Sequence, residues 1–275
     1  MILTFHPVSA KLIDMLLLRQ TGSGMILAYV GQGRPVQTEE RFLINIINSK
    51  LFKHLKRILG RGNPSLRGVV DPLYTALASY TFARPEKLQN LRRLASELNQ
   101  RGIEGDFVEC GTYKGGSLAV LGTELSTTRQ LWAYDSFAGM PATTSLDGTD
   151  AQVYVGKGIA SPQDVRDALA IAKVDVARCT IREGWFQDTF QQPLPASVAL
   201  LHCDADWHDS VLLVLETLYP LVAAGGCVIL DDFGYWEGCR EAFYTFCERH
   251  QERPLLERWG TDQAYWFKGR QHNRN

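Results

Sequence analysis

Long hydrophobic runs are missing from this chain of 275 residues. The apolar stretches near its beginning, 12–18 and 24–30, are too short to span a bilayer. The first contains Asp14 and lacks the small-residue cleavage site of a secretion signal. We therefore expect no membrane-spanning helix and predict a cytoplasmic protein.

An excess of charge of one sign is also missing, because 29 Lys and Arg stand against 30 Asp and Glu. This balance creates no strong field toward nucleic acid or an acidic membrane surface. The partner that we expect is a small molecule, and not a nucleic acid.

Cysteine pairs with metal-binding spacing are absent as well. None of the six cysteines forms a CxxC pair, and most lie in apolar runs that are typical of strands or helices. We interpret them as reduced, buried thiols of a cytosolic protein.

The pattern that is present changes near Gly105. After this residue short apolar runs alternate with helical patterns, which is typical of an α/β fold with a mostly parallel sheet covered on both faces. Residues 255–259 and 264–268 are predicted to close the sheet as an antiparallel hairpin. The other predicted strands are 106–110, 131–135, 178–183, 198–204 and 227–231, and the predicted helices are 116–125, 162–172 and 210–222.

The part before Gly105 shows helix-like stretches and no strand pattern. Residues 43–59 place apolar side chains on one helical face and basic side chains on the rest. Such a helix can lie on a membrane surface, but it more often packs on a sheet domain or across a dimer, so we favour packing. We divide the chain into an unassigned extension (1–40), a helical region able to support a homo-oligomer (41–104) and a sheet domain (105–269).

A stretch without clear periodicity, 140–158, directly follows a predicted strand end. Long irregular segments in compact domains are usually lids or disordered insertions. Because ligands bind at strand ends in this architecture, we favour a lid.

A strand, a glycine turn and a helix start follow one another in residues 106–117. Gly111, Gly115 and Gly116 let the backbone bend tightly and approach a ligand. Their GxxxGG spacing differs from the GxGxxG of dinucleotide-binding folds, which argues against NAD. Glu109 and Asp135, at successive strand ends, suit the ammonium of a methionine moiety and ribose hydroxyls; an ordinary tight loop with capping acids is the alternative.

Four carboxylates lie at two further strand ends. Asp204 and Asp206 share one face of their strand, and Asp231 and Asp232 end the next. If they converge, they repel one another unless a cation neutralises them, and an all-oxygen set favours Mg²⁺ or a similar hard ion. The alternative is that they cap helices and face water separately.

Two histidines and an aromatic pair accompany these motifs. The imidazole of His208 suits proton transfer, although a lone histidine near a cleft is more often a structural or surface group. His202 lies inside its strand and is predicted to be in the core. Trp185 and Phe186 follow the third strand and can cover an adenine ring or simply pack between sheet and helix.

The order of these motifs resembles the macrocin-type O-methyltransferases of natural-product biosynthesis. The matching stretches are GDFVECGTYKGGS (105–117), YDSFAGMP (134–141), GWFQDT (184–189), DADWHDS (204–210) and LYPLVAAGGCVILDDF (218–233). The resemblance implies a Rossmann-like class I methyltransferase fold over 105–269. It also implies methylation of a hydroxyl on a sugar or other small molecule, with S-adenosylmethionine and Mg²⁺.

On the matching positions the resemblance assigns the metal to Asp204, Asp231 and Asp232, and general base work to Asp206. The chain has DADWHD where the family more usually has glycine between the acids and then an aliphatic–aromatic pair, which makes His208 a second candidate base. The cofactor residues that we predict are Glu109, Gly111, Gly115, Gly116, Ser117, Asp135, Ser136, Phe137, Gly184, Trp185, Phe186 and Asp204.

Two other functions remain open. A metal-dependent methyltransferase of the catechol or phenylpropanoid type has the same chemistry with a flat phenolic substrate, which Trp207, Tyr235 and Trp236 would suit. A non-catalytic nucleotide-binding module is the more distant alternative, and the electrostatic cost of an unused carboxylate cluster argues against it.

Overall fold

The computed structural model describes residues 16–21, 24–29 and 71–270 and divides the chain into two compact units, 1–69 and 70–275. In the first unit, β1 (Leu16–Thr21) and β2 (Gly24–Tyr29) pair antiparallel. The expectation of no strands before Gly105 is therefore wrong. The signal that identifies this hairpin is the Gly22-Ser23 dipeptide between two apolar runs. The helix predicted over 43–59, with its oligomer role, lies outside the described residues.

A seven-stranded sheet forms the second unit, in the order β5-β4-β3-β6-β7-β9-β8. The strands from β3 to β7 are parallel, and β9 joins β7 antiparallel. This topology confirms the predicted α/β fold with a closing hairpin. The strands are β3 (Asp106–Cys110), β4 (Leu131–Asp135), β5 (Cys179–Glu183), β6 (Val198–Cys203), β7 (Val222–Leu230), β8 (Glu257–Trp259) and β9 (Gln263–Phe267).

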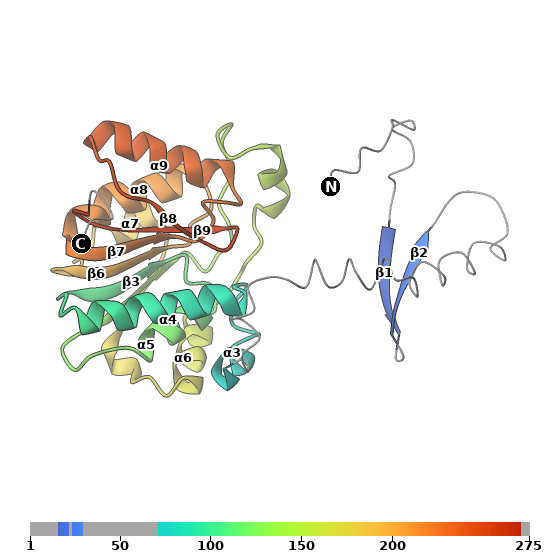
Figure 1. Cartoon of the computed structure of the whole chain (residues 1–275), viewed down its shortest axis with the longest axis horizontal. Helices are drawn as coiled ribbons and strands as arrows, with labels where there is room; N and C mark the ends of the chain where they lie inside the picture. The colour runs from blue at the N-terminus through green and yellow to red at the C-terminus, as the bar shows by residue number, and fades with distance from the viewer. Residues whose placement is uncertain (1–15, 22–23, 30–70, 271–275) are drawn as a thin grey trace, which may run out of the picture. The chain divides into compact units, whose positions relative to one another are not determined.

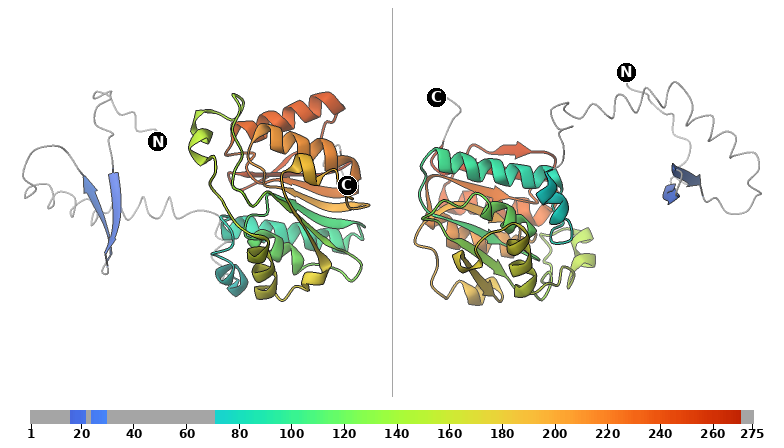
Figure 2. Two further views of the ribbon diagram at one scale, coloured as in Figure 1. Left: turned by 180° about the vertical axis from the view of Figure 1, so that it is seen from behind. Right: turned by 90° about the horizontal axis from the view of Figure 1, so that it is seen from below.

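Helices cover both faces of this sheet, as Figure 1 shows with α4, α5 and α6 below the strands and α8 and α9 above them. Seen from below in Figure 2, α4, α5 and α6 lie in front of the sheet. The helix predicted to reach 222 ends at Leu218, because Pro220 cannot continue it. The helices are α3 (Pro72–Ala76), α4 (Pro85–Gln100), α5 (Gly116–Gly122), α6 (Pro162–Ile171), α7 (Phe186–Thr189), α8 (His208–Leu218) and α9 (Glu237–His250).

Two apolar clusters lie on opposite sides of the sheet, because successive strand side chains point to opposite faces. Val108 and Leu201 pack in the cluster of α8 and α9, whereas Phe107 and Leu200 pack in the cluster of α4, α5 and α6. Helix α4 belongs to this second cluster through leucines at helical spacing, which are Leu88, Leu91, Leu94 and Leu98. The sheet unit therefore begins before Gly105 and includes α4.

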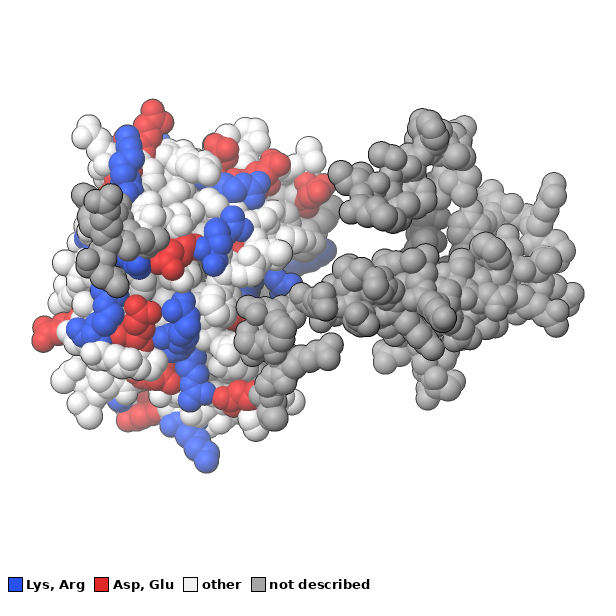
Figure 3. Space-filling view, in the orientation of Figure 1, with Lys and Arg blue, Asp and Glu red and all other residues white. Residues whose placement is uncertain are grey.

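The surface on the side shown in Figure 3 carries basic and acidic side chains side by side. In the described part of the chain, no helix is long and apolar enough to cross a membrane.

The six cysteines are free thiols that differ in burial, and we expect them to differ in reactivity for this reason. Burial raises the pKa of Cys179 to about 12 and that of Cys247 to about 11, although both are only half-buried. At pH 8 we expect slow reaction of these two with Ellman's reagent, and reaction of the other four only after unfolding in guanidinium. Rapid release of more than two equivalents from the native protein would contradict this packing. The four buried thiols are Cys110, Cys203, Cys227 and Cys239.

Candidate active site

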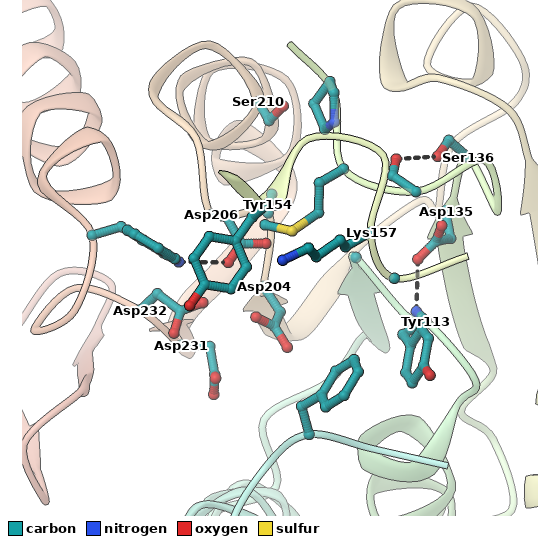
Figure 4. A pocket seen from close by; sticks show the side chains of 18 of the residues that line it. Tyr113, Asp135, Ser136, Tyr154, Lys157, Asp204, Asp206, Ser210, Asp231 and Asp232 are labelled. Atoms are coloured by element: carbon teal, nitrogen blue, oxygen red, sulfur yellow. Dashed lines mark hydrogen bonds between the residues drawn. The ribbon is translucent and has the colours of Figure 1, made fainter. Parts of the chain in front are cut away.

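A pocket of about 610 Å³ opens at the carboxyl ends of the parallel strands. It lies where the chain reverses its order in the sheet, between β3 and β6, and ligands bind at such a switch point in open α/β sheets. Asp135 and Ser136 line one end, and Asp204, Asp206 and Asp232 line the other (Figure 4). The predicted cofactor and metal motifs therefore share one cavity.

The loop after β3 is shaped by Gly111. Its φ is +87°, and a Cβ at this position would lie 1.7 Å from the carbonyl oxygen of Asp204. This close approach joins the ends of β3 and β6, with the Asp204 N–H donating to the Cys110 carbonyl at 2.8 Å. Gly115 and Gly116 instead allow α5 to pack against Val165 and Tyr80 respectively, so among these three glycines only Gly111 lines the pocket.

Asp135 lies at the centre of the end nearest this loop. Burial raises its pKa overall, while backbone N–H groups of Phe137 and Tyr113 counteract the shift by donating to the carboxylate at 2.7 and 2.6 Å. The pocket wall here includes Ser136, Gly184, Trp185 and Phe186. Ser117 and the Phe137 ring are buried outside the lining.

Glu109 is fully buried and is not among the lining residues. Its Oε1 lies 2.7 Å from Nδ1 of His202, whereas its Oε2 has no hydrogen-bond partner among the described residues. A buried carboxylate oxygen without a partner is costly, so this atom is suited to a cationic ligand group.

Carboxylate oxygens of Asp204, Asp206 and Asp232 come within 4.8 Å of one another. Burial and then the neighbouring carboxylates raise the pKa of Asp204 and of Asp206 well above the usual range. Asp206 has a φ of 54° and accepts a hydrogen bond from Nε1 of Trp236 at 2.9 Å, which orients its carboxylate. The structure thus brings together the four acids that the sequence singled out.

Lys87, on α4, is part of this end of the pocket and was not predicted. Its Nζ lies 2.5 Å from Oδ2 of Asp231 and 3.5 Å from Oδ1 of Asp232. Burial alone would lower the pKa of Lys87, but the two carboxylates raise it overall. A lysine on an amphipathic helix is usually solvated, so its sequence position carried no signal of this role.

Two buried side chains, Gln263 and His202, also contact the carboxylate of Asp231. Gln263 Nε2 donates to its Oδ1 at 2.6 Å, and His202 Nε2 lies 3.2 Å from the same oxygen. Burial alone would raise the pKa of Asp231, but the hydrogen bond from His202 and the charge of Lys87 lower it overall. His202 is buried as predicted, although its neighbours are carboxylates: burial would lower its pKa, and the hydrogen bonds to Asp231 and Glu109 raise it to about 9.

His208 lies apart from this cluster. Its ring Nδ1 is 2.8 Å from Oδ1 of Asp209, its backbone N–H donates to Asp147, and it does not line the pocket. Of the two candidate bases, only Asp206 faces the cavity in this structure.

The segment 140–158 forms a wall of the acidic end and contains a short 3-10 helix, Thr149–Tyr154. It is anchored where the carboxylate of Asp147 accepts the N–H of His208 at 2.6 Å, and where Trp207 Nε1 donates to the Pro141 carbonyl at 3.1 Å. The segment therefore contributes to the pocket wall and is hydrogen-bonded to the start of α8, and its role as a lid stays a prediction. Three aromatic side chains line this part of the cavity, which are Tyr154, Tyr235 and Trp236.

Known proteins are similar to this chain in sequence. Residues 19–268 match the family model described as macrocin O-methyltransferase (TylF). The chain belongs to this family. It is therefore an S-adenosylmethionine-dependent methyltransferase, and the resemblance stated from the motifs is confirmed.

Individual relatives cover most of the fold. The chain is 28% identical over 220 residues to the 8-demethyl-8-(2,3-dimethoxy-alpha-L-rhamnosyl)-tetracenomycin-C 4'-O-methyltransferase of Streptomyces olivaceus, covering 76% of this chain and 79% of that protein. It is 27% identical to the demethyldecarbamoylnovobiocin O-methyltransferase of Streptomyces niveus, covering 70% and 77%. The solved structure of the O-methyltransferase NovP superposes with a TM-score of 0.63 at 25% identity, covering 70% of this chain and 83% of that one. The Rossmann-like class I fold is thereby confirmed.

The close approach of Gly111 to the Asp204 carbonyl can be tested by its effect on the free energy of unfolding. Gly111→Ala places a Cβ against the Asp204 carbonyl, so we expect a loss of at least about 3 kcal/mol in the free energy of unfolding, or no folded protein. The matched control is Gly102→Ala, where φ is +65° and no atom lies within 4 Å of the added Cβ. Only backbone strain of about 1–2 kcal/mol is expected there. Equal losses in urea unfolding would argue against the contact.

Proposed function

We propose that this methyltransferase acts on a hydroxyl of a sugar or other natural-product small molecule and uses Mg²⁺. The observation that carries the proposal is the presence of both strand-end motifs, Asp135 and the acids around Asp204, in one cavity. The relative from Streptomyces olivaceus, whose name specifies a rhamnosyl-bearing tetracenomycin and 4'-O methylation, supports the acceptor class.

Residues in and behind the pocket wall fit the cofactor. Asp135, which lines the pocket, offers carboxylate oxygens for ribose hydroxyls, and the unpaired Oε2 of the buried Glu109 offers an acceptor for an ammonium group. Trp185 and Phe186 provide aromatic faces for an adenine ring. Bound S-adenosylmethionine would supply a methyl group already activated by a positively charged sulfur.

The acidic end fits a hard divalent cation. Asp204, Asp206 and Asp232 offer carboxylate oxygens only, and a second group joins Asp204 and Asp231 to His202. Buried carboxylates so close together are stabilised by added positive charge. We infer that Asp204, Asp231 and Asp232 would hold Mg²⁺, with Asp206 nearby as the base. Bound there, the ion would lower the pKa of a coordinated hydroxyl.

The chain's own residues then divide the work. Asp206 accepts the proton of the acceptor hydroxyl, and the hydrogen bond from Trp236 keeps its carboxylate directed into the cavity. The segment 140–158 and the aromatic side chains beside it orient the acceptor and exclude water, and orientation supplies most of the acceleration in a transfer of this kind.

A flat phenolic acceptor is the second candidate, because aromatic side chains line the pocket close to the acids. Trp236 packs edge-to-face against Tyr154 and Tyr235, with ring centroids 5.2 and 4.6 Å apart, which provides aromatic surface close to the acids. Such surface binds an aromatic ring or the apolar face of a sugar. Assay of glycosides beside catechols, with the same enzyme, decides between the two.

Removal of one acid tests the metal role. For Asp204→Asn we expect kcat/KM to fall at least about 100-fold, while the affinity for S-adenosylhomocysteine measured by calorimetry stays nearly unchanged. The matched control is Asp209→Asn, since Asp209 is on α8 with a side chain 70% exposed and outside the pocket. Full activity of Asp204→Asn would refute the assignment, and joint loss of transfer and binding would indicate a folding defect.

Chelation tests the same assignment without mutation. We expect EDTA to abolish methyl transfer and excess Mg²⁺ to restore it, because the carboxylates then lack their cation. A thermal-shift series with S-adenosylhomocysteine, NAD or buffer should show stabilisation by the first ligand alone. Turnover unaffected by EDTA would remove the metal from the proposal.

A further inference from the structure

His202 is a fully buried side chain that methyl transfer as described does not use. It lies on β6, paired with Glu109 of β3 on one side and Ile229 of β7 on the other. Its Nδ1 is 2.7 Å from Oε1 of Glu109, and its Nε2 is 3.2 Å from Oδ1 of Asp231. One imidazole therefore lies between Glu109 of β3 and Asp231, the residue that follows β7.

Both neighbours of this ring are carboxylates, and each ring nitrogen lies within hydrogen-bonding distance of one of them. A ring held from both sides in this way restricts the orientation of both carboxylates. These contacts also leave Oε2 of Glu109 unpaired.

We propose that His202 is a positioning residue shared by the cofactor and the metal: it orients Glu109 toward the cofactor ammonium and Asp231 toward Mg²⁺. The inference rests on the proposed function for the roles of these two acids. Outer-shell partners of metal ligands fix the ligand's orientation, and their loss weakens metal binding. Here the same partner also serves the cofactor-binding carboxylate.

Gln263 provides a matched control for this shared role. It donates to the same oxygen of Asp231, at 2.6 Å, and its other amide atom accepts from Asn90 at 3.0 Å. Like His202 it is fully buried. No hydrogen bond among the described residues joins Gln263 to Glu109, so its loss should affect the metal end only.

The experiment compares His202→Gln and Gln263→Leu with the wild type by calorimetry, using S-adenosylhomocysteine in EDTA and, separately, MgCl₂. Melting temperatures identify variants that are folded. We expect His202→Gln to bind S-adenosylhomocysteine about 10-fold more weakly in EDTA, and both variants to bind Mg²⁺ about 10- to 100-fold more weakly. Gln263→Leu should bind S-adenosylhomocysteine in EDTA as the wild type does.

Wild-type affinity of His202→Gln for S-adenosylhomocysteine in EDTA would overturn the shared role, as would equal weakening in Gln263→Leu. If His202→Gln does not fold, Glu109→Gln replaces it. That change replaces the charged cofactor-side partner of the imidazole with a neutral amide, which holds the ring less firmly. Mg²⁺ binding should therefore weaken although Glu109 is outside the pocket lining. Unchanged Mg²⁺ affinity would overturn the inference. A wild type that binds no Mg²⁺ or no S-adenosylhomocysteine would instead refute the proposed function.

Discussion

Repulsion among buried carboxylates is the constraint on which the rest of this site depends. Asp204, Asp206 and Asp232 present oxygens within 4.8 Å of one another, in a cavity where charge is poorly solvated. Compact folding requires positive charge or hydrogen-bond donors around them. Lys87 from α4 supplies part of it beside Asp232, and Lys87 and the buried ring of His202 both contact the neighbouring Asp231. The metal hypothesis proposes that a divalent cation supplies the rest of the positive charge.

The sheet topology brings these carboxylates together, because they follow the adjacent strands β6 and β7. Parallel strands end at one edge, and the reversal of chain order between β3 and β6 leaves a crevice there. Gly111 allows the loop after β3 to approach Asp204 closely. This approach joins the cofactor end of the pocket to the acidic end. In the proposed reaction the methyl donor and the acceptor hydroxyl would lie close together, because the strands that carry the cofactor residues (β3 and β4) adjoin those that carry the acids (β6 and β7).

Much of the fold was predictable, because it depends on local patterns. Apolar runs ending in Cys110 and Asp135 identified β3 and β4 with the bounds that the structure has. The acids were also identified, since strand ends and residue type are both visible in a sequence. Lys87 was missed because its helix turns it toward partners 144 and 145 residues away. The ion pair between Lys87 and Asp231 depends on how α4 packs, which no local pattern encodes.

The sequence by itself determined the fold class, the order of the motifs and the family, because periodicity and strand-end chemistry are local properties. Only the tertiary structure decided which side chains share the cavity. It placed Asp206 in the pocket and His208 outside it, although only Trp207 separates them in the chain. It also gave buried His202 two carboxylate partners in place of apolar core contacts. The physical reason is that hydrogen bonds and ion pairs depend on distances of a few ångströms, and tertiary packing sets those distances.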